Sequence, residues 1–369
     1  MRCSSLSAAV SPERAHERAA KLTRGRLASL LFILALAVAL VRLWAVSRTV
    51  PVPKTSTAVP ARDGHPEAAA TRPPSSSPEV PQSDGAWSEA NSFAVGRGPE
   101  GVLFDGTSVW VANQFSNTVT KLRANDGATL GTFAVGRRPL GLAFDGSSVW
   151  VTDNRTNDVT RLRAGDGAVL GTFPVGDAPA GIAYDGATVW VANRSSHDVT
   201  RLRASDGALL GTSAVGSNPS SVAFDGANVW VTNSGSNDVT KLRAGDGATL
   251  GTFPVGDGPS GVVFDGTNLW VANFFGKTVM KLRPSDGAVL ATFAVDDGPA
   301  GLAVAGPHLW IANTGTDRVT KLRLLDGSVV ERLRVGKSPA TVAFDGTNIW
   351  VTNAGSNTVS KRPAAGSHP

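Results

Sequence analysis

An all-β fold, a seven-bladed β-propeller, is predicted by three features of the 369-residue sequence. Tryptophan recurs every 40 residues, four strand-like runs lie in each 40-residue unit, and Asp-Gly pairs separate the runs. A unit of this kind is typical of a propeller blade, because one blade cannot bury both faces of its sheet and must stack against neighbours. The seven repeated tryptophans are Trp110, Trp150, Trp190, Trp230, Trp270, Trp310 and Trp350. Seven units predict a closed ring over residues 92–362.

The first unit shows how one blade is built. Its strand-like runs are residues 98–106, 107–113, 117–123 and 128–135. Asp-Gly is favoured in tight hairpins, so these runs predict four antiparallel strands, A to D. On strand B, Trp110 and Ala112 alternate with valines, as expected of a sheet covered on both faces, and the tryptophans are predicted to be core residues. Asp-Gly also occurs in calcium loops, but no acidic residues follow at coordinating offsets, and we predict structural turns and no metal or cofactor.

Strand C carries a repeated basic pattern. Lys121 and Arg123 flank a leucine in the first unit, and five further units have the same arrangement. We expect these side chains to form surface pairs with turn aspartates, each contributing little to stability.

The two ends of the repeat array predict how the ring closes. The seventh unit lacks an outer strand, since the chain leaves through residues 363–369, which we expect to be a disordered tail. Residues 92–96 match the end of a D strand without a unit of their own. We expect them to supply the outer strand of the last blade, so that no sheet edge is left exposed by an open ring.

The repeat resembles a known family. Residues 344–353, Phe-Asp-Gly-Thr-Asn-Ile-Trp-Val-Thr-Asn, followed by Gly-Ser-Asn-Thr-Val, are similar to the YVTN-type β-propeller repeat, with Trp350 where the Tyr would stand. Such repeats are similar to those of periplasmic YncE-like proteins, archaeal surface-layer proteins, NHL propellers and, more distantly, streptogramin lyases. The resemblance implies a propeller over residues 92–362, but it spans binding, structural and enzymatic members.

The segments before the propeller indicate export. Residues 1–26 form a basic leader, and residues 27–46 are mainly apolar with Arg42 near their end. This pattern favours a signal-anchor helix with its N-terminus in the cytoplasm, which would hold the propeller outside the cytoplasm. The alternative is a signal peptide cleaved near Ser47, which would release a secreted protein. Residues 47–91 contain eight prolines and are expected to be a disordered tether.

The charge distribution excludes one class of partner. Residues 1–91 hold 11 Lys and Arg against 7 Asp and Glu, while residues 92–369 hold 24 against 23. The propeller is therefore nearly neutral and offers no basic field to nucleic acid. We expect the propeller itself to be monomeric.

A binding surface is predicted where the units differ. The A–B and C–D turns are nearly uniform, whereas the D–A and B–C loops, which share one face of a propeller, vary. We call this face the top face. Its departures from the repeat place basic residues on one arc and acidic and aromatic residues on another. The candidate binding residues are Arg97, Glu100, Phe115, Arg137, Arg138, Arg155, Arg194, His197, Phe274, Phe275, Lys277, Asp296 and Asp297.

The predicted function is a ligand- or protein-binding or assembly module of the cell envelope, with a protein or charged small molecule at the top face. Loop drift without function is the simpler interpretation of the same pattern. A lyase-like enzyme would need a histidine near acidic groups, and His197 with Glu100 is the one such pair on this face, since His308 lies in a turn of the opposite face. We predict no catalytic residues, and keep the lyase-like enzyme and a purely structural repeat as alternatives.

Overall fold

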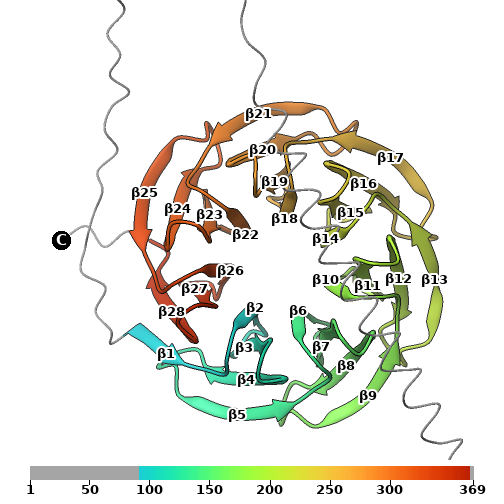
Figure 1. Ribbon diagram of the computed structural model, residues 1–369, viewed down its shortest axis with the longest axis vertical. Helices are drawn as coiled ribbons and strands as arrows, with labels where there is room; N and C mark the ends of the chain where they lie inside the picture. The colour runs from blue at the N-terminus through green and yellow to red at the C-terminus, as the bar shows by residue number, and fades with distance from the viewer. Residues whose placement is uncertain (1–90, 366–369) are drawn as a thin grey trace, which may run out of the picture. The chain divides into compact units, whose positions relative to one another are not determined.

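The computed structural model describes residues 91–365 as seven four-stranded antiparallel sheets arranged in a ring (Figure 1). The strands are β1 (Ser92–Ala94), β2 (Pro99–Phe104), β3 (Ser108–Asn113), β4 (Thr118–Arg123), β5 (Thr129–Ala134), β6 (Pro139–Phe144), β7 (Ser148–Asp153), β8 (Asp158–Arg163), β9 (Val169–Pro174), β10 (Pro179–Tyr184), β11 (Thr188–Asn193), β12 (Asp198–Arg203), β13 (Leu209–Ala214), β14 (Pro219–Phe224), β15 (Asn228–Asn233), β16 (Asp238–Arg243), β17 (Thr249–Pro254), β18 (Pro259–Phe264), β19 (Leu269–Asn273), β20 (Thr278–Leu282), β21 (Val289–Ala294), β22 (Pro299–Ala305), β23 (His308–Asn313), β24 (Arg318–Arg323), β25 (Val329–Arg334), β26 (Pro339–Phe344), β27 (Asn348–Asn353) and β28 (Thr358–Pro363). The predicted all-β propeller is confirmed.

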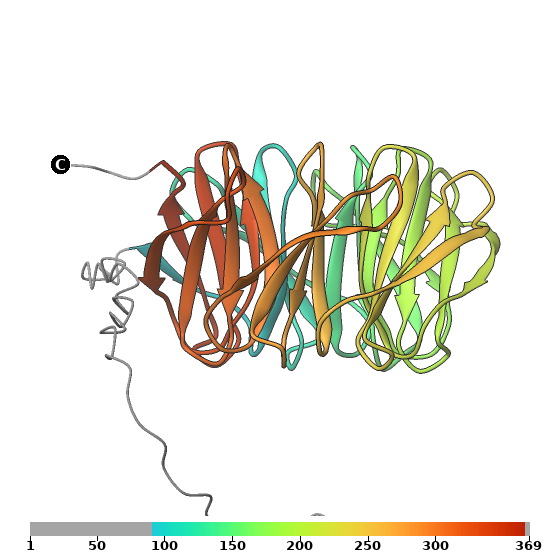
Figure 2. The ribbon, with the colours of Figure 1, turned by 90° about the horizontal axis from the view of Figure 1, so that it is seen from above.

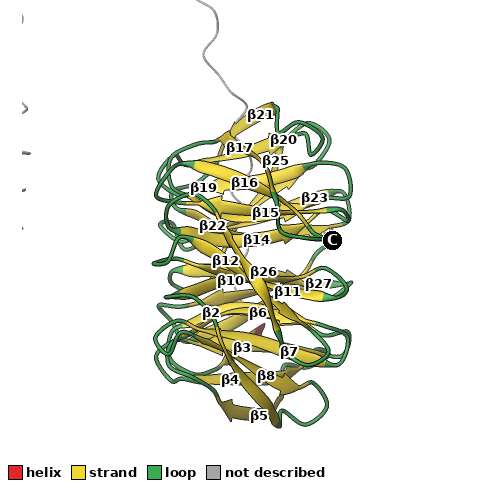
Figure 3. Ribbon diagram, turned by 90° about the vertical axis from the view of Figure 1, so that its right-hand side faces the viewer, coloured by secondary structure: helices red, strands yellow, loops and turns green. Residues whose placement is uncertain are grey.

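Each blade runs outward from the centre of the ring. The A strands β2, β6, β10, β14, β18, β22 and β26 surround the central channel, and the D strands form the rim (Figure 1). Figures 2 and 3 show the loops gathered on two opposite faces of the ring. The top-face loops therefore surround one mouth of the channel.

The ring closes through the strand nearest the start of the described chain. β1 pairs antiparallel with β28, with Phe93 opposite Val359, and completes the seventh sheet. The Phe93 ring lies 5.6 Å from the ring of Trp350, the position that Phe133 takes beside Trp110 within the first blade. The predicted closure is thus present, and the last blade is no less complete than the others.

The repeated tryptophans are fully buried between blades. In six blades the indole Nε1 donates to the Asp of the A–B turn, as Trp110 does to Asp105 Oδ2. Asp105 Oδ1 also accepts from the backbone N–H groups of Thr107 and Ser108. Burial raises the pKa of Asp105, but these hydrogen bonds outweigh it and hold the pKa below its usual value. The turn aspartates are therefore occupied by their own hairpins, as predicted.

The basic pattern of strand C divides into two rows. Arg123 forms the expected exposed pair with Asp126, at 3.0 Å. Lys121 is only 8% exposed: its Nζ lies 5.1 Å from the Trp110 ring centroid and donates to Ala164 O, in the next blade, at 2.6 Å. The prediction of a surface pair is wrong for the lysines of this row, because the long apolar stem can lie along the tryptophan while the ammonium reaches a carbonyl. Arg161, in the same row, does pair with the turn residue Asp145 at 3.3 Å, but in a largely buried contact.

No helix long and apolar enough to cross a membrane occurs within residues 91–365. The predicted leader at 1–26, the signal-anchor at 27–46 and the tether, up to residue 90, lie outside the described residues.

Candidate functional site

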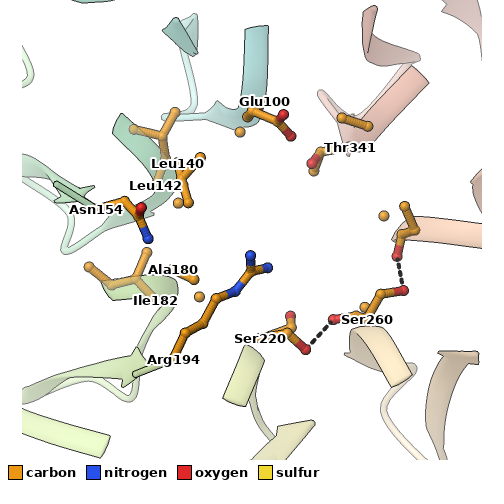
Figure 4. Close-up of a pocket in the computed structure, with 18 of the residues that line it drawn as sticks. Glu100, Leu140, Leu142, Asn154, Ala180, Ile182, Arg194, Ser220, Ser260 and Thr341 are labelled. Atoms are coloured by element: carbon orange, nitrogen blue, oxygen red, sulfur yellow. Dashed lines mark hydrogen bonds between the residues drawn. The ribbon is translucent and has the colours of Figure 1, made fainter. Parts of the chain in front are cut away.

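A cavity of about 560 Å³ opens into the central channel from the top face (Figure 4). All seven A strands contribute to its wall. The strands approach so closely there that a Cβ on Gly101 would lie 2.2 Å from the carbonyl oxygen of Leu140 in the next blade, and one on Gly261 would meet Ala300 O at the same distance. Glycine at this position brings the inner strands together and leaves the neighbouring side chains facing the channel.

One side of the mouth holds a fixed carboxylate. Glu100, the second residue of β2, accepts a 2.7 Å hydrogen bond at Oε1 from Gln114 Nε2, and Gln114 Oε1 accepts from Arg138 Nε at 2.8 Å. Arginine only donates and a carboxylate only accepts, so these two neighbours determine which way the buried Gln114 amide faces. Burial raises the pKa of Glu100 more than Arg194, Arg138 and the Gln114 hydrogen bond lower it.

Arg194 extends into the middle of the cavity from the B–C loop after β11 (Figure 4). Its guanidinium makes no hydrogen bond or ion pair with any residue between 91 and 365, although Glu100 acts on it electrostatically. The enclosing blades lower the pKa of Arg194 by desolvation, Glu100 raises it, and Arg138 lowers it further. The Arg194 side chain nevertheless remains open to water in the channel. Its guanidinium stays charged near neutral pH and has no hydrogen-bond or ion-pair partner among the described residues.

The rest of the wall is divided by chemistry. Leu140, Leu142 and Ile182 from blades 2 and 3 form a mainly apolar side, with the amide of Asn154 beside them (Figure 4). On the opposite side Ser220 Oγ donates to Pro259 O at 3.0 Å and Ser260 Oγ to Pro299 O at 2.9 Å, each in the following blade. Because their protons are used in this way, these hydroxyls present lone pairs to the channel.

The structure brings only three of the predicted site residues together in the cavity, namely Glu100, Arg138 and Arg194. The arginines at 97, 137 and 155 are exposed on the top-face loops but do not line it. The basic arc of the prediction therefore converges on the channel through Arg138 and Arg194 alone.

The predicted acidic arc is already paired within the protein. Asp296 contacts Arg332 Nε at 2.9 Å in a partly buried ion pair, and Asp297 contacts Lys277 Nζ at 3.2 Å. These residues connect neighbouring loops and blades, and they do not present the uncompensated negative charge that the sequence suggested.

The aromatic residues of the top face cover loop glycines. A Cβ on Gly98 or Gly258 would collide with the ring of Phe115 or Phe275, respectively, so each ring lies directly over the loop. Phe115 and Phe275 remain 59% and 67% exposed, and Phe274 makes an edge contact with Phe275 at 5.2 Å. They stand beside the loops and outside the cavity lining.

His197 has a structural role that its residue type concealed. It has φ of 58°, and its Nδ1 accepts from the backbone N–H of Asn218 at 3.0 Å. Asn117, Asn157 and Asn237 have the same left-handed backbone and accept from the equivalent loop N–H with Oδ1. His197 is therefore a loop cap, and it is not among the cavity-lining residues that surround Glu100.

Sequence reasoning missed Gln114, Asn154, Ser220, Ser260 and Thr341, which line the cavity. For Ser220 and Ser260 the missing signal was the second residue of strand A, which reads Glu, Leu, Ala, Ser, Ser, Ala and Ala through the seven blades. A position that varies on an otherwise uniform strand marks a side chain that packing does not constrain.

Within residues 91–365 no group of three or more His, Cys, Asp or Glu side chains is arranged to hold a metal ion. No family model matches the chain, and no curated protein does. The YVTN-type resemblance therefore has no matching family model behind it.

Solved structures share the fold. Hydrazine synthase of Kuenenia stuttgartiensis has a TM-score of 0.66 at 22% identity, covering 73% of this chain and 96% of that one. A catalytically inactive His-to-Ala variant of virginiamycin B lyase from Staphylococcus aureus, with quinupristin, has a TM-score of 0.63 at 21% identity, and the match covers 74% of this chain and 96% of that one. A streptogramin B lyase has a TM-score of 0.64 at 18% identity, and the match covers 74% of this chain and 99% of that one. At such identities the likeness is one of fold: this chain is a seven-bladed propeller similar in architecture to streptogramin lyases.

Proposed function

We propose that this protein is a binding module of the cell envelope that takes up a ligand carrying an anionic group at the top mouth of the channel. The observation that carries the proposal is Arg194. A guanidinium that projects into the middle of a cavity, is open to water and has no hydrogen-bond or ion-pair partner among residues 91–365 is a ready partner for a carboxylate or a phosphate.

The cavity supports a small ligand or the end of a chain. Its volume of about 560 Å³ lies in the range of small-molecule pockets, and its wall combines an apolar side with a few polar groups. Streptogramin lyases share the fold, but His197, the top-face histidine that a lyase-like mechanism would call on, caps a loop and does not line the cavity.

The envelope location rests on the sequence of residues 27–46. We expect the full chain to sediment with membranes and to be digested by protease added outside spheroplasts, whereas a chain lacking residues 27–46 should stay in the cytoplasm. Recovery of the full chain from the cytoplasm would refute this location.

Binding is tested by calorimetric titration with acetate, phosphate and N-acetyl-leucyl-leucine. At least one anion should bind, and Arg194→Gln should abolish the binding. Arg155→Gln is the matched control, because Arg155 follows the preceding blade's B strand, is exposed on the same face and does not line the cavity. Equal losses in the two variants, or no anion binding by the unmodified protein, would refute the proposal.

A further inference from the structure

The channel mouth holds two opposite charges that do not neutralise each other. Glu100 and Arg194 interact electrostatically, yet no ion pair joins them. Gln114 and Arg138 hold Glu100 at blade 1, while Arg194 extends from blade 3. Two flexible, freely moving side chains of opposite charge would meet, so the anchoring of Glu100 maintains a gap between them.

The remaining oxygen of this carboxylate is available to a ligand. Gln114 donates to Oε1, and no residue within 91–365 donates a hydrogen bond to Oε2. Figure 4 shows Glu100 at the cavity wall and Arg194 projecting into the space inside it. The cavity thus offers one acceptor for a cation and one donor group for an anion.

The wall between these charges is mainly apolar, with Asn154 and Arg138 of blade 2 as its polar side chains. Blade 2 stands between blades 1 and 3 in the ring, and its strand β6 contributes Leu140 and Leu142, with Ile182 following on β10. A ligand reaching from Glu100 to Arg194 along this side would cover apolar surface between its ends. An apolar ligand would match neither charge, and an anion alone would place no cation beside the free oxygen of Glu100.

We infer that the ligand is a small zwitterion with an apolar middle, such as a short apolar peptide with free termini, whose ammonium lies against Glu100 and whose carboxylate lies against Arg194. This inference rests on the proposed function and deepens it, since it adds a cation subsite to the anion subsite. The cavity volume is sufficient for a ligand of this size.

The experiment compares three forms of one dipeptide by calorimetry at neutral pH and low salt. Leucyl-leucine has both charges, N-acetyl-leucyl-leucine keeps only the carboxylate, and leucyl-leucine amide keeps only the ammonium. The zwitterion should bind about tenfold or more tightly than either blocked form, because each terminus adds a charge-assisted hydrogen bond.

Two variants assign the termini. Glu100→Gln should lower the affinity for leucyl-leucine to about that for the N-acetyl form and leave the N-acetyl form unaffected. Arg194→Gln should lower the affinity for leucyl-leucine to about that for leucyl-leucine amide and leave the affinity for the amide unaffected. Arg155→Gln should leave all three affinities unchanged, and thermal unfolding of each variant checks that the propeller is intact.

The outcomes separate the two proposals. If the N-acetyl form binds as tightly as the zwitterion, with dependence on Arg194 and none on Glu100, the zwitterion inference is refuted and the anion site stands. If none of the three dipeptides binds, the zwitterion inference is refuted, and the acetate and phosphate titrations then decide the anion site separately.

Discussion

Replacing Asp153 by asparagine should stabilise the propeller at neutral pH. Six blades have asparagine at the last position of strand B, and blade 2 has this aspartate, which is fully buried. Its cross-strand neighbour is Asp158. In blade 3 the same two positions hold Asn193 and Asp198, whose side chains are hydrogen-bonded at 2.7 Å. Asp153→Asn would replace two facing carboxylates with this neutral amide–carboxylate pair.

The size of the effect follows from the pKa. Burial, opposed by the Thr160 hydrogen bond and reinforced by Asp158, raises the pKa of Asp153 from 3.8 to about 7. Between about pH 4 and pH 7 the folded protein keeps a proton that the unfolded chain has lost, so stability falls as pH rises through this window and is constant above it. At 1.36 kcal/mol per pKa unit, the shift corresponds to about 4 kcal/mol. The asparagine of the variant does not titrate, so its stability lacks this dependence on pH.

The measurement is urea unfolding of both proteins at several pH values from 4 to 8. The difference in unfolding free energy, variant minus parent, should grow by about 4 kcal/mol between pH 4 and pH 7 and then level off, which separates Asp153 from the other carboxylates. Asn193→Asp is the matched reversal, because it would create the facing pair of carboxylates in blade 3. A pH-independent difference for Asp153→Asn would refute the reasoning.

Three further predictions concern the core, the closure and the site. Trp230→Ala should cost about 3 to 5 kcal/mol in urea unfolding, whereas Phe275→Gly should cost little, since its ring is 67% exposed; similar costs would place that ring in the core. Deleting residues 1–96 removes β1 and should cause aggregation in light scattering, unlike deletion of 1–84, and equal solubility would contradict the role of β1 in closure. Leucyl-leucine binding should weaken as the pH falls through the pKa of Glu100, which lies above the ordinary glutamate value of 4.5, because the carboxylate is then neutralised. N-acetyl-leucyl-leucine binding should not weaken in this range, and parallel pH profiles of the two ligands would exclude Glu100 from the site.

The fold could be predicted because the residues that determine it recur in every blade. Each of these features indicates a local structure: Trp110 and its counterparts, the turn aspartates, and the short outer strand at Phe93. The strands begin and end close to the predicted positions. The buried lysines could not be predicted in this way. Lys121 donates to carbonyls in the next blade, 43 and 44 residues further along the chain, and no local pattern distinguishes that contact from an exposed charge.

The site was predicted only in part, because sequence shows that a loop differs from its repeats but does not show where its side chains go. His197 departs from the asparagine that four other blades have at this position and keeps the asparagine's hydrogen bond. Asp296 departs from a glycine and is paired with Arg332. Glu100 was selected for its charge, and its place on the wall of the channel depends on the inward direction of the second residue of strand A.

A departure from the repeat is therefore insufficient evidence for a binding site in a propeller. The repeated polar groups satisfy one another, as Asp105 does with Trp110, and several of the divergent charges have partners of their own, as Asp297 has in Lys277. What distinguishes Arg194 is that it diverges, projects into the open mouth of the channel and makes no side-chain hydrogen bond there with the residues between 91 and 365. Water in the channel solvates this guanidinium, so an anion that binds there gains a charge-assisted, bidentate partner without first breaking a bond within the protein, and this is the physical reason for assigning the ligand to this position.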